Sequence, residues 1–370
     1  MDNKKKAHIC SECGGDFSDV ELVDFDGLFL CPDCLESLTV SCRDCGTRMW
    51  RDDNEGTIDH PLCESCRRED YTSCTRCGRL VRNGHLYYVD EDDDYGYCES
   101  CYAIAKERSI KNYSYKPEPI FYGDGPKYLG VELEIDGANE DCDNADQILW
   151  IGNRDDEHIY CKHDGSLNDG FEIVTHPMSL HYHLHHFPWA EVLEKAKSMG
   201  YTSHQARTCG LHIHVSRRAF GSTPEEQDNV IARVLYFVEK HWNELLLFSR
   251  RTQAQLDRWA TRYGYKDQPQ EMMEHVKKGY GNRYTCINLT NTDTIEFRIF
   301  RGTLKLNTLI ATLQMVSHIC DVAIALPDEE LRKLSWSQFV ASLGEPELVQ
   351  YLKERRLYVS APVTESEVEI

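Results

Sequence analysis

Basic residues are scarce in this 370-residue chain. Only 41 lysines and arginines stand against 62 aspartates and glutamates, which gives a formal net charge of −21. The imbalance is already present through Lys116, where 15 basic residues face 24 acidic ones. Non-specific affinity for nucleic acid comes from cations that neutralise phosphates, so nucleic acid is not an expected partner.

Other common features are missing as well. No run of apolar residues approaches the length that crosses a bilayer, so we expect no membrane span. The chain starts MDNKKKAHIC without an apolar signal segment, and we expect a cytoplasmic protein. Neither a P-loop nor a glycine-rich dinucleotide fingerprint occurs, so these two motifs cannot account for nucleotide binding.

Cysteine, in contrast, is abundant and unevenly spread. Twelve of the 17 cysteines lie in the first 101 residues as six Cys-x-x-Cys pairs. Spacing groups them into three units: Cys10, Cys13, Cys31 and Cys34; Cys42, Cys45, Cys63 and Cys66; and Cys74, Cys77, Cys98 and Cys101. Four thiolates complete the tetrahedral shell of Zn²⁺, so each unit is predicted to be a closed, structural zinc site.

The repeat extends beyond the cysteines. A glycine follows the second cysteine of each unit (Gly14, Gly46 and Gly78), where a chain that wraps a metal needs a positive φ. Disulfides are the alternative, but they need an oxidising compartment, and five further cysteines are scattered singly. Ligation within each unit is favoured because the spacing repeats, although spacing alone leaves shared ligands possible.

These patterns divide the chain into six ranges. Zinc fingers are predicted at 1–38, 39–70 and 71–112, a linker at 113–127, one larger domain at 128–358 and a flexible acidic tail at 359–370. With so few cations, the fingers are expected to recognise a protein or to serve as a scaffold. The sequence does not specify an oligomeric state.

Three predicted strands carry pairs of charged or imidazole side chains. The segments are YLGVELEID, CGLHIHVS and DTIEFRIFRG, and the pairs are Glu132 with Glu134, His212 with His214, and Glu296 with Arg298. Side chains alternate along a strand with period two, so the members of a pair share one face. Carboxylates and imidazoles gathered on one sheet face suit a divalent cation, and oxygen-rich ligation favours Mg²⁺ or Mn²⁺.

Further candidates lie between these strands. Glu172 interrupts an apolar run in a strand predicted at Phe171 to Thr175, and it is a predicted ligand. Asp164 belongs to an Asp-Gly pair that is also typical of an ordinary turn. The pair Arg250-Arg251 at a helix end either favours the helix dipole or reaches an anionic ligand.

The helices are predicted to be mostly core. A capped helix runs from Ser222 to about Phe248, and a second one runs from Leu306 to Leu326. The histidine run at 181–186 is predicted to be a solvated loop. Lys266 to Arg283 is a candidate lid, and Arg283 is a candidate contact for an anion.

Read in order, GVELEID, DGSL with FEIVTHP, GLHIHVS, and RYTCINL with TIEFRIFRGTL resemble the amidoligase family of the glutamine synthetase and glutamate–cysteine ligase superfamily. The resemblance covers Tyr128 to about Leu326 and leaves out the fingers. It implies an α+β fold in which helices pack on one face of an antiparallel sheet and the open face holds ATP and Mg²⁺. The implied activity is ATP-driven amide formation between a carboxylate and an amine.

The resemblance also implies roles for single residues. The implied metal ligands are Glu132, Glu134, Glu172 and Glu296. His212 is implied as a ligand or nucleotide contact, with His214 beside it, and Arg298 as the cation that faces the γ-phosphate. Arg250 and Arg283 remain candidate contacts for the anionic cofactor.

Three functions compete. The leading hypothesis is an ATP-dependent carboxylate–amine ligase that works through an acyl phosphate and forms an amide or isopeptide bond, with the fingers recruiting a macromolecular substrate such as a protein. A metal-dependent hydrolase would instead use His212, His214 and a nearby glutamate to hold Zn²⁺ with an activated water. A non-catalytic adaptor would bind through the fingers and keep the second domain as a scaffold.

Overall fold

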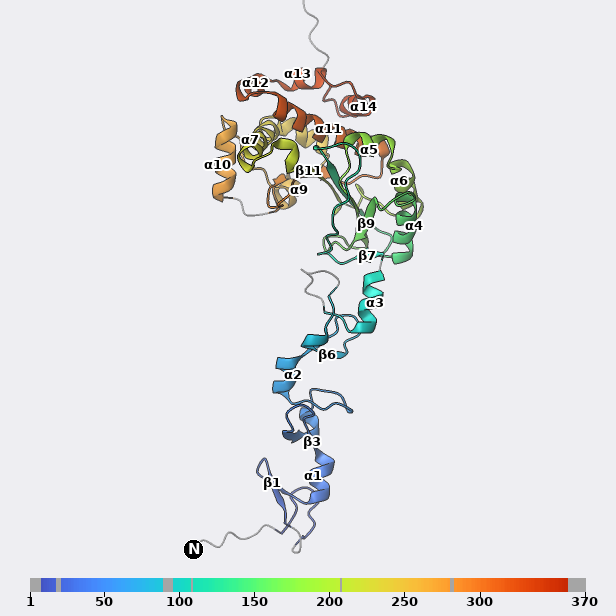
Figure 1. The fold of residues 1–370 in the computed structure, drawn as a ribbon, viewed down its shortest axis with the longest axis vertical. Helices are drawn as coiled ribbons and strands as arrows, with labels where there is room; N and C mark the ends of the chain where they lie inside the picture. The colour runs from blue at the N-terminus through green and yellow to red at the C-terminus, as the bar shows by residue number, and fades with distance from the viewer. Residues whose placement is uncertain are drawn as a thin grey trace, which may run out of the picture. The chain divides into compact units, whose positions relative to one another are not determined.

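The computed structural model describes residues 8–17, 21–88, 96–107, 109–206, 208–279 and 283–358. The chain forms two compact units, Met1–Glu107 and Arg108–Ile370 (Figure 1). The acidic tail predicted at 359–370 lies outside the described residues.

The first unit repeats one small design three times. Each repeat combines a short hairpin with a short helix: β1 (Val23–Phe25), β2 (Leu28–Leu30) and α1 (Pro32–Leu38); β3 (Thr39–Ser41), β4 (Arg48–Trp50) and α2 (Glu64–Asp70); β5 (Tyr71–Ser73), β6 (Leu80–Arg82) and α3 (Glu99–Glu107). In the first repeat this hairpin follows the first cysteine pair, whereas in the other two it encloses that pair. The residue before each third cysteine (Leu30, Leu62 and Tyr97) is buried and forms a minimal core with the cysteines. Gly14, Gly46 and Gly78 have φ values of 68°, 76° and 71°, which confirms the predicted positive φ.

Successive repeats contact each other directly. The Phe25 and Trp50 rings meet edge to face at 4.8 Å between centroids, and Trp50 Nε1 donates to Asp26 Oδ2 at 3.1 Å. Between the second and third repeats, the Tyr71 hydroxyl donates to Asp44 Oδ2 at 3.0 Å. The three repeats are therefore linked by specific polar contacts as well as by the chain.

One seven-stranded sheet organises the second unit. Its strand order is β12 (Ile287–Asn288), β13 (Thr294–Arg301), β11 (Gly210–Ser216), β8 (Leu129–Asp136), β10 (Gly170–Thr175), β9 (Ile159–Lys162) and β7 (Ile110–Lys111). Neighbours are antiparallel except β7 and β9. The strands predicted at the polar pairs and at Glu172 are confirmed, and the unit is a mixed α/β structure with a mostly antiparallel sheet. Strand β7 joins this sheet although its residues fall within the range predicted for the third finger.

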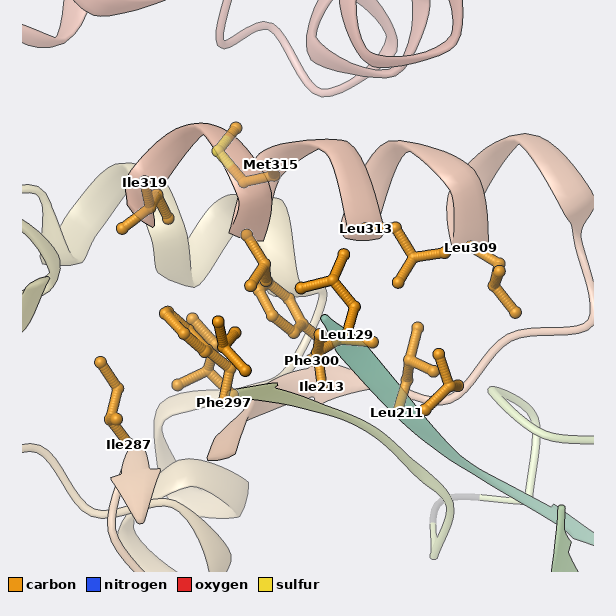
Figure 2. Packing of buried hydrophobic residues seen from close by; sticks show 14 of the residues in the cluster. Leu129, Leu211, Ile213, Ile287, Phe297, Phe300, Leu309, Leu313, Met315 and Ile319 are labelled. Atoms are coloured by element: carbon orange, nitrogen blue, oxygen red, sulfur yellow. The ribbon is translucent and has the colours of Figure 1, made fainter. Parts of the chain in front are cut away.

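The rest of the second unit is largely helical. The helices are α4 (Cys142–Gly152), α5 (Leu180–His185), α6 (Trp189–Ser198), α7 (Pro224–Lys240), α8 (Trp242–Ser249), α9 (Gln253–Trp259), α10 (Pro269–Gly279), α11 (Leu306–Ala325), α12 (Asp328–Lys333), α13 (Trp336–Ala341) and α14 (Pro346–Glu354), with a short 3₁₀ turn at Arg217–Phe220. Figure 2 shows α11 lying over the apolar side of the strands. The labelled side chains that face each other there are Leu309, Leu313 and Ile319 from α11 and Leu129, Leu211, Ile213, Ile287, Phe297 and Phe300 from the strands, whereas Met315 points from α11 away from the sheet.

Helix α11 corrects one expectation. An 18-residue window within its 20 residues has a mean hydropathy of 1.5, so by length and composition this one helix of the described chain could cross a membrane. The prediction that no apolar run approaches such a length is therefore wrong. However, 72% of the window is buried inside the protein, as expected for the central helix of a core.

Three other predictions need correction. The helix predicted from Ser222 to Phe248 is divided at His241 into α7 and α8, although its capping box between Thr223 and Glu226 is present. The histidine run at 181–186 is not a solvated loop, because α5 covers most of it and His183 is buried. Most of the segment predicted as a lid is α10, which packs on α7 through buried side chains such as Met272, while residues 280–282 lie outside the described chain.

Candidate active site

The register of the sheet places the predicted pairs on one polar face. Glu134 lies opposite Glu172 in the β8–β10 pair, and Glu132 lies opposite His212 in the β8–β11 pair. His214 in turn lies opposite Glu296 of β13. Cross-strand partners share a face, so one continuous polar surface extends over four adjacent strands.

The first cluster consists of Glu132, His212 and Glu296, whose ligand atoms all lie within 4.8 Å of one another. His212 Nδ1 is 3.2 Å from Glu132 Oε2 and 3.5 Å from Glu296 Oε1. His214 Nε2 approaches the other oxygen of Glu132 at 3.1 Å. His212 and Glu296 are buried, so this cluster is largely shielded from bulk water.

The second cluster consists of Glu134, Asp164 and Glu172, again within 4.8 Å. His212 Nε2 lies 3.7 Å from Glu134 Oε1, so the two clusters meet at one imidazole. The sequence left Asp164 open as a turn residue. It forms the turn, since its Oδ1 accepts the Ser166 N–H at 2.6 Å, and it also faces the two glutamates.

Charges within the clusters shift the carboxyl pKa values in opposite directions. Burial, followed by the carboxylates of Glu132 and Asp164, raises the pKa of Glu172 well above its usual range. Burial opposes ionisation of Glu132 too, but His214 and His212 hold its pKa well below the usual range. Crowded carboxylates of this kind are stabilised by a cation, because each one otherwise disfavours ionisation of the others.

The donor set fits a hard divalent cation. Five carboxylates and one imidazole converge, and Mg²⁺, Mn²⁺ and Ca²⁺ prefer oxygen ligands of this type. Catalytic zinc sites more often present two or three nitrogen or sulfur ligands, whereas each cluster here offers at most one. The residues are therefore suited to magnesium or manganese more than to zinc.

Two arginine side chains lie beside the carboxylates. An Arg298 Nη1 atom bonds the Glu296 carboxylate, and its Nε is buried without a hydrogen-bond partner among the described residues. Burial lowers the pKa of Arg251 to about 10, although the nearby Glu134 carboxylate counteracts this. A phosphate that entered the site would thus meet two half-buried guanidinium groups.

Sequence reasoning missed Asn288 and left the role of Arg251 open. Asn288 Nδ2 donates to Glu296 Oε2 at 2.8 Å, and it stands opposite Glu296 in the β12–β13 register. The signal was a polar residue between Ile287 and Leu289 in a segment already noted as part of the family pattern. Arg251 lies in an irregular segment after α8, where no periodicity indicates which way a side chain points.

The two remaining candidates lie elsewhere. The exposed Arg283 guanidinium lies over the rings of Tyr113 at 5.6 Å and Tyr284 at 5.0 Å from their centroids. Tyr113 also lies under the ammonium group of Lys162, and Tyr115 packs edge to face on Tyr160. The segment predicted as a linker is therefore attached to the sheet at its start. Arg250 lines a separate pocket beyond the end of β13.

The cysteine units have the geometry of zinc sites. In each unit the four Sγ atoms lie within 4.8 Å of one another, and the grouping is sequential. The Cys45–Cys63 and Cys77–Cys98 sulfurs are 3.7 and 3.8 Å apart. A tetrahedral zinc with Zn–S bonds of about 2.3 Å separates its sulfurs by about 3.8 Å. None of the 17 cysteines forms a disulfide.

Hydrogen bonds favour the thiolate form of some of these sulfurs, although the hydrogen bond to Cys31, followed by burial, raises the pKa of Cys34 to about 12. The Cys31 N–H donates to Cys10 Sγ at 3.4 Å, and it is the first of several backbone donors that lower the pKa of Cys10 to about 6. The Cys34 N–H likewise donates to Cys31 Sγ at the start of α1. The thiolate is the form that binds metal, so the backbone arrangement favours zinc.

A comparison with family models bears on the second unit. A model described as "Putative amidoligase enzyme" matches residues 150–320, from the end of α4 into α11. Over this stretch the chain is similar to amidoligases. The matched range includes Glu172, His212 and Glu296, whereas β8 with Glu132 and Glu134 precedes it.

Two further comparisons, with solved structures and with curated proteins, add little. The crystal structure of a bifunctional glutathione synthetase from Pasteurella multocida is similar with a TM-score of 0.33 and 14% identity, over 62% of this chain and 46% of that one. The chain thus spans less than half the length of that protein. No curated protein matches the chain.

Proposed function

We propose that the second unit is an ATP-dependent carboxylate–amine ligase with a catalytic sheet of the glutamine synthetase type. The observation that carries the proposal is the pair of carboxylate clusters joined at His212 on one sheet face, with Arg298 and Arg251 beside them. The match of the amidoligase family model to residues 150–320 supports the same class of reaction.

The proposed reaction has two steps. A carboxylate oxygen of one substrate attacks the γ-phosphorus of ATP, the bond from that phosphorus to the bridging oxygen breaks, and ADP leaves. An amine nitrogen of the second substrate then attacks the acyl carbon and loses a proton as inorganic phosphate leaves. Bound Mg²⁺ or Mn²⁺ would neutralise phosphate charge during the transfer.

Different side chains of the site would have different roles in this reaction. Glu132, His212 and Glu296 would hold one cation, and Glu134, Asp164 and Glu172 would hold another. His214, with its Nε2 at 3.1 Å from Glu132, would keep that carboxyl group ionised. The unpartnered Nε of Arg298 is a donor for an oxygen of the transferring phosphoryl group, whose charge the guanidinium offsets.

The experiment compares ATP turnover in wild type, Glu132→Gln and Glu296→Gln, with Mg²⁺ and a panel of amino acids, polyamines and protein carboxylates. Both variants should lose about 100-fold or more of the activity, since each removes charge that holds the phosphates in place. Glu274→Gln changes an exposed glutamate on α10 and is the matched control.

Undiminished turnover in both site variants would remove the ligase assignment. Bond hydrolysis without ATP, together with a fourth equivalent of tightly bound zinc, would favour the hydrolase. A protein that binds partners but neither Mg²⁺ nor nucleotide would be an adaptor.

We infer that the fingers recruit a macromolecular substrate, which would make the product an isopeptide when a protein side chain takes part. Each finger is closed by four sulfurs and offers no open metal position for chemistry. Mass spectrometry of a cell extract incubated with ATP and the protein should reveal a mass-shifted target that is absent with Glu132→Gln. Unchanged proteins in both samples, despite turnover of small amines, would contradict recruitment.

A further inference from the structure

A second binding feature lies beyond the end of β13. A surface pocket of about 370 Å³ is lined by Lys197, Arg250 and the segments 201–205 and 303–305. None of its lining residues is acidic, although the protein carries a formal charge of −21. The formal charge of this lining is therefore positive, whereas the net charge of the protein is negative.

Arg250 interacts with the Tyr351 hydroxyl but is incompletely paired in this pocket. Its Nε and Nη2 atoms are buried and have no hydrogen-bond partner among the described residues. These two nitrogens form one edge of the guanidinium group, which matches the two oxygens of a carboxylate or phosphate in a bidentate pair. Leaving such donors buried and unpaired is costly, so a ligand that accepts both bonds would be stabilised.

The backbone of Arg250 is also unusual. It ends α8 in the left-handed conformation, with φ 61° and ψ 13°. Glycine is the usual residue there, because a side chain costs about 1 kcal/mol in this region. Strained positions of this kind concentrate at functional sites, and an arginine at one is a candidate for ligand binding.

The other basic side chains of the lining are less available to an anion than Arg250. Burial, followed by the charges of Arg250 and Arg301, lowers the pKa of His204 in the same lining. Lys197 and Lys305 pair with the carboxylates of Glu194 and Glu354 at 2.5 and 3.2 Å. In the described parts of the chain, Arg250 forms no such ion pair. It is thus the cation best placed to accept an external anion.

The pocket adjoins the carboxylate clusters. Ser203, part of its lining, donates through Oγ to the Glu134 carbonyl at 2.8 Å. Arg251 follows Arg250 in the chain, and its side chain extends toward His212. Both side chains border Gly210, because a Cβ built on that glycine would lie 2.6 Å from Arg251 Nη2 and 2.6 Å from His212 Nε2. Consecutive arginines therefore face two neighbouring sites.

We propose that this pocket binds a carboxylate of the small-molecule substrate, with Arg250 as its bidentate donor. The assignment to a substrate rests on the proposed ligase function, whereas the binding itself does not. A volume of about 370 Å³ suits a molecule of amino-acid or short-peptide size. Phosphate shares the recognition chemistry and is the alternative ligand to be tested.

Calorimetric titration of the full-length, zinc-loaded protein tests the proposal. Glutarate, glutamate and N-acetylglycine are added separately in the absence of ATP, and inorganic phosphate is added in a parallel arm. At least one carboxylate should bind saturably, and its Kd should rise about tenfold or more in Arg250→Gln. Arg250→Lys should also weaken binding, because it keeps the charge but lacks the two-nitrogen edge.

Arg356→Gln is the control. Arg356 is an exposed arginine with φ 58° that follows α14, so the variant removes the same charge from the same backbone conformation outside the pocket. It should bind carboxylate as wild type does. Equal binding in wild type and Arg250→Gln, no carboxylate binding by wild type, or binding of phosphate alone would each overturn the proposal.

The outcome is distinguishable from failure of the ligase function. The titration needs no ATP, and the turnover experiment varies Glu132 and Glu296 instead of Arg250. Suppose that Arg250→Gln loses carboxylate binding while the Glu132 and Glu296 variants keep full ATP turnover. The carboxylate pocket would then be supported, and the ligase function would be contradicted. If Arg250→Gln binds carboxylate as wild type does while the glutamate variants lose ATP turnover, the ligase function would be supported and this substrate site would be contradicted.

Discussion

Glu132 and Glu172 face the same polar surface, yet their carboxyl groups are held in opposite states. Burial and the neighbouring carboxylates of Glu132 and Asp164 favour the protonated form of Glu172, while His214 and His212 favour ionised Glu132. Like charges confined in one buried site cannot all ionise without a counterion. The protein alone therefore keeps the site partly protonated, and a divalent cation would replace a proton as it binds.

His183 gives a pH-dependent prediction at the residue scale. Its Nε2–H donates to the Leu129 carbonyl at 3.0 Å, and its Nδ1 accepts from Trp189 Nε1 at 3.3 Å, which fixes the neutral imidazole. Burial lowers the pKa of His183 from 6.5 to about 4. The unfolded chain thus binds this proton more readily than the folded one. The resulting stability is present above pH 6.5 and is lost as the pH falls through 4.

The loss should amount to about 3 kcal/mol of unfolding free energy over that range. Urea denaturation of wild type and His183→Gln between pH 7 and pH 4 measures it, and the variant should show a shallower decline. His186→Gln, at the exposed end of the same histidine run, is the control. Parallel pH profiles for wild type and His183→Gln would contradict the assignment.

Single residues of the candidate site could be predicted where the sequence has a regular strand pattern, and not elsewhere. Glu132, Glu134, His212, His214, Glu296 and Arg298 were found because strict alternation along a strand determines which face a side chain occupies. Asp164 and Arg251 lie in a turn and after a helix, where no such rule applies. His183 differs from its neighbours in the histidine run because α5 turns it inward, and composition alone does not show which histidine that will be.

At the scale of elements, regular patterns were predicted better than interruptions. Strands β8, β10, β11 and β13 and helix α11 followed from their periodic patterns, whereas the short strands β7, β9 and β12 were not predicted. The break at His241, the helix α10 in a polar segment and the irregular register between β11 and β13 near Leu211 and Ile213 were not predicted either. Each depends on packing partners distant in sequence, which override local preference.

Helix α11 supplies the element-scale prediction. Leu313 is fully buried against the sheet, so Leu313→Ala should lower the free energy of unfolding by 2–5 kcal/mol through lost contacts and a residual cavity. Ile324→Ala, on the same helix at 42% exposure, should cost much less. Thermal or urea unfolding of the two variants compares them directly, and similar losses would mean that α11 is not the central core helix.

At the scale of the whole molecule, the two units should respond differently to metal removal. The first unit has only minimal clusters around its cysteines, so zinc should supply most of its folding free energy. The second has one large core of its own. Its fold should therefore not depend on zinc.

We expect three equivalents of zinc in the purified protein. A strong zinc chelator should abolish the structure of the first unit while the unfolding transition of the second persists, together with ATP turnover on small amines when Mg²⁺ is resupplied. Elemental analysis, circular dichroism and a coupled ADP assay make these measurements. Joint unfolding of both units, or a zinc content well below three, would contradict the division.

The attachment of Tyr113 and Tyr115 to the sheet determines where the protein can safely be shortened. A chain that began at Lys116 would lose strand β7, the ring beneath Arg283 and the edge contact on Tyr160 together with the fingers. Its inactivity would then say nothing about the fingers. A chain that began at Ser109, whose hydroxyl bonds Asp146, keeps all of these contacts and is the fragment in which to ask what the catalytic unit does alone.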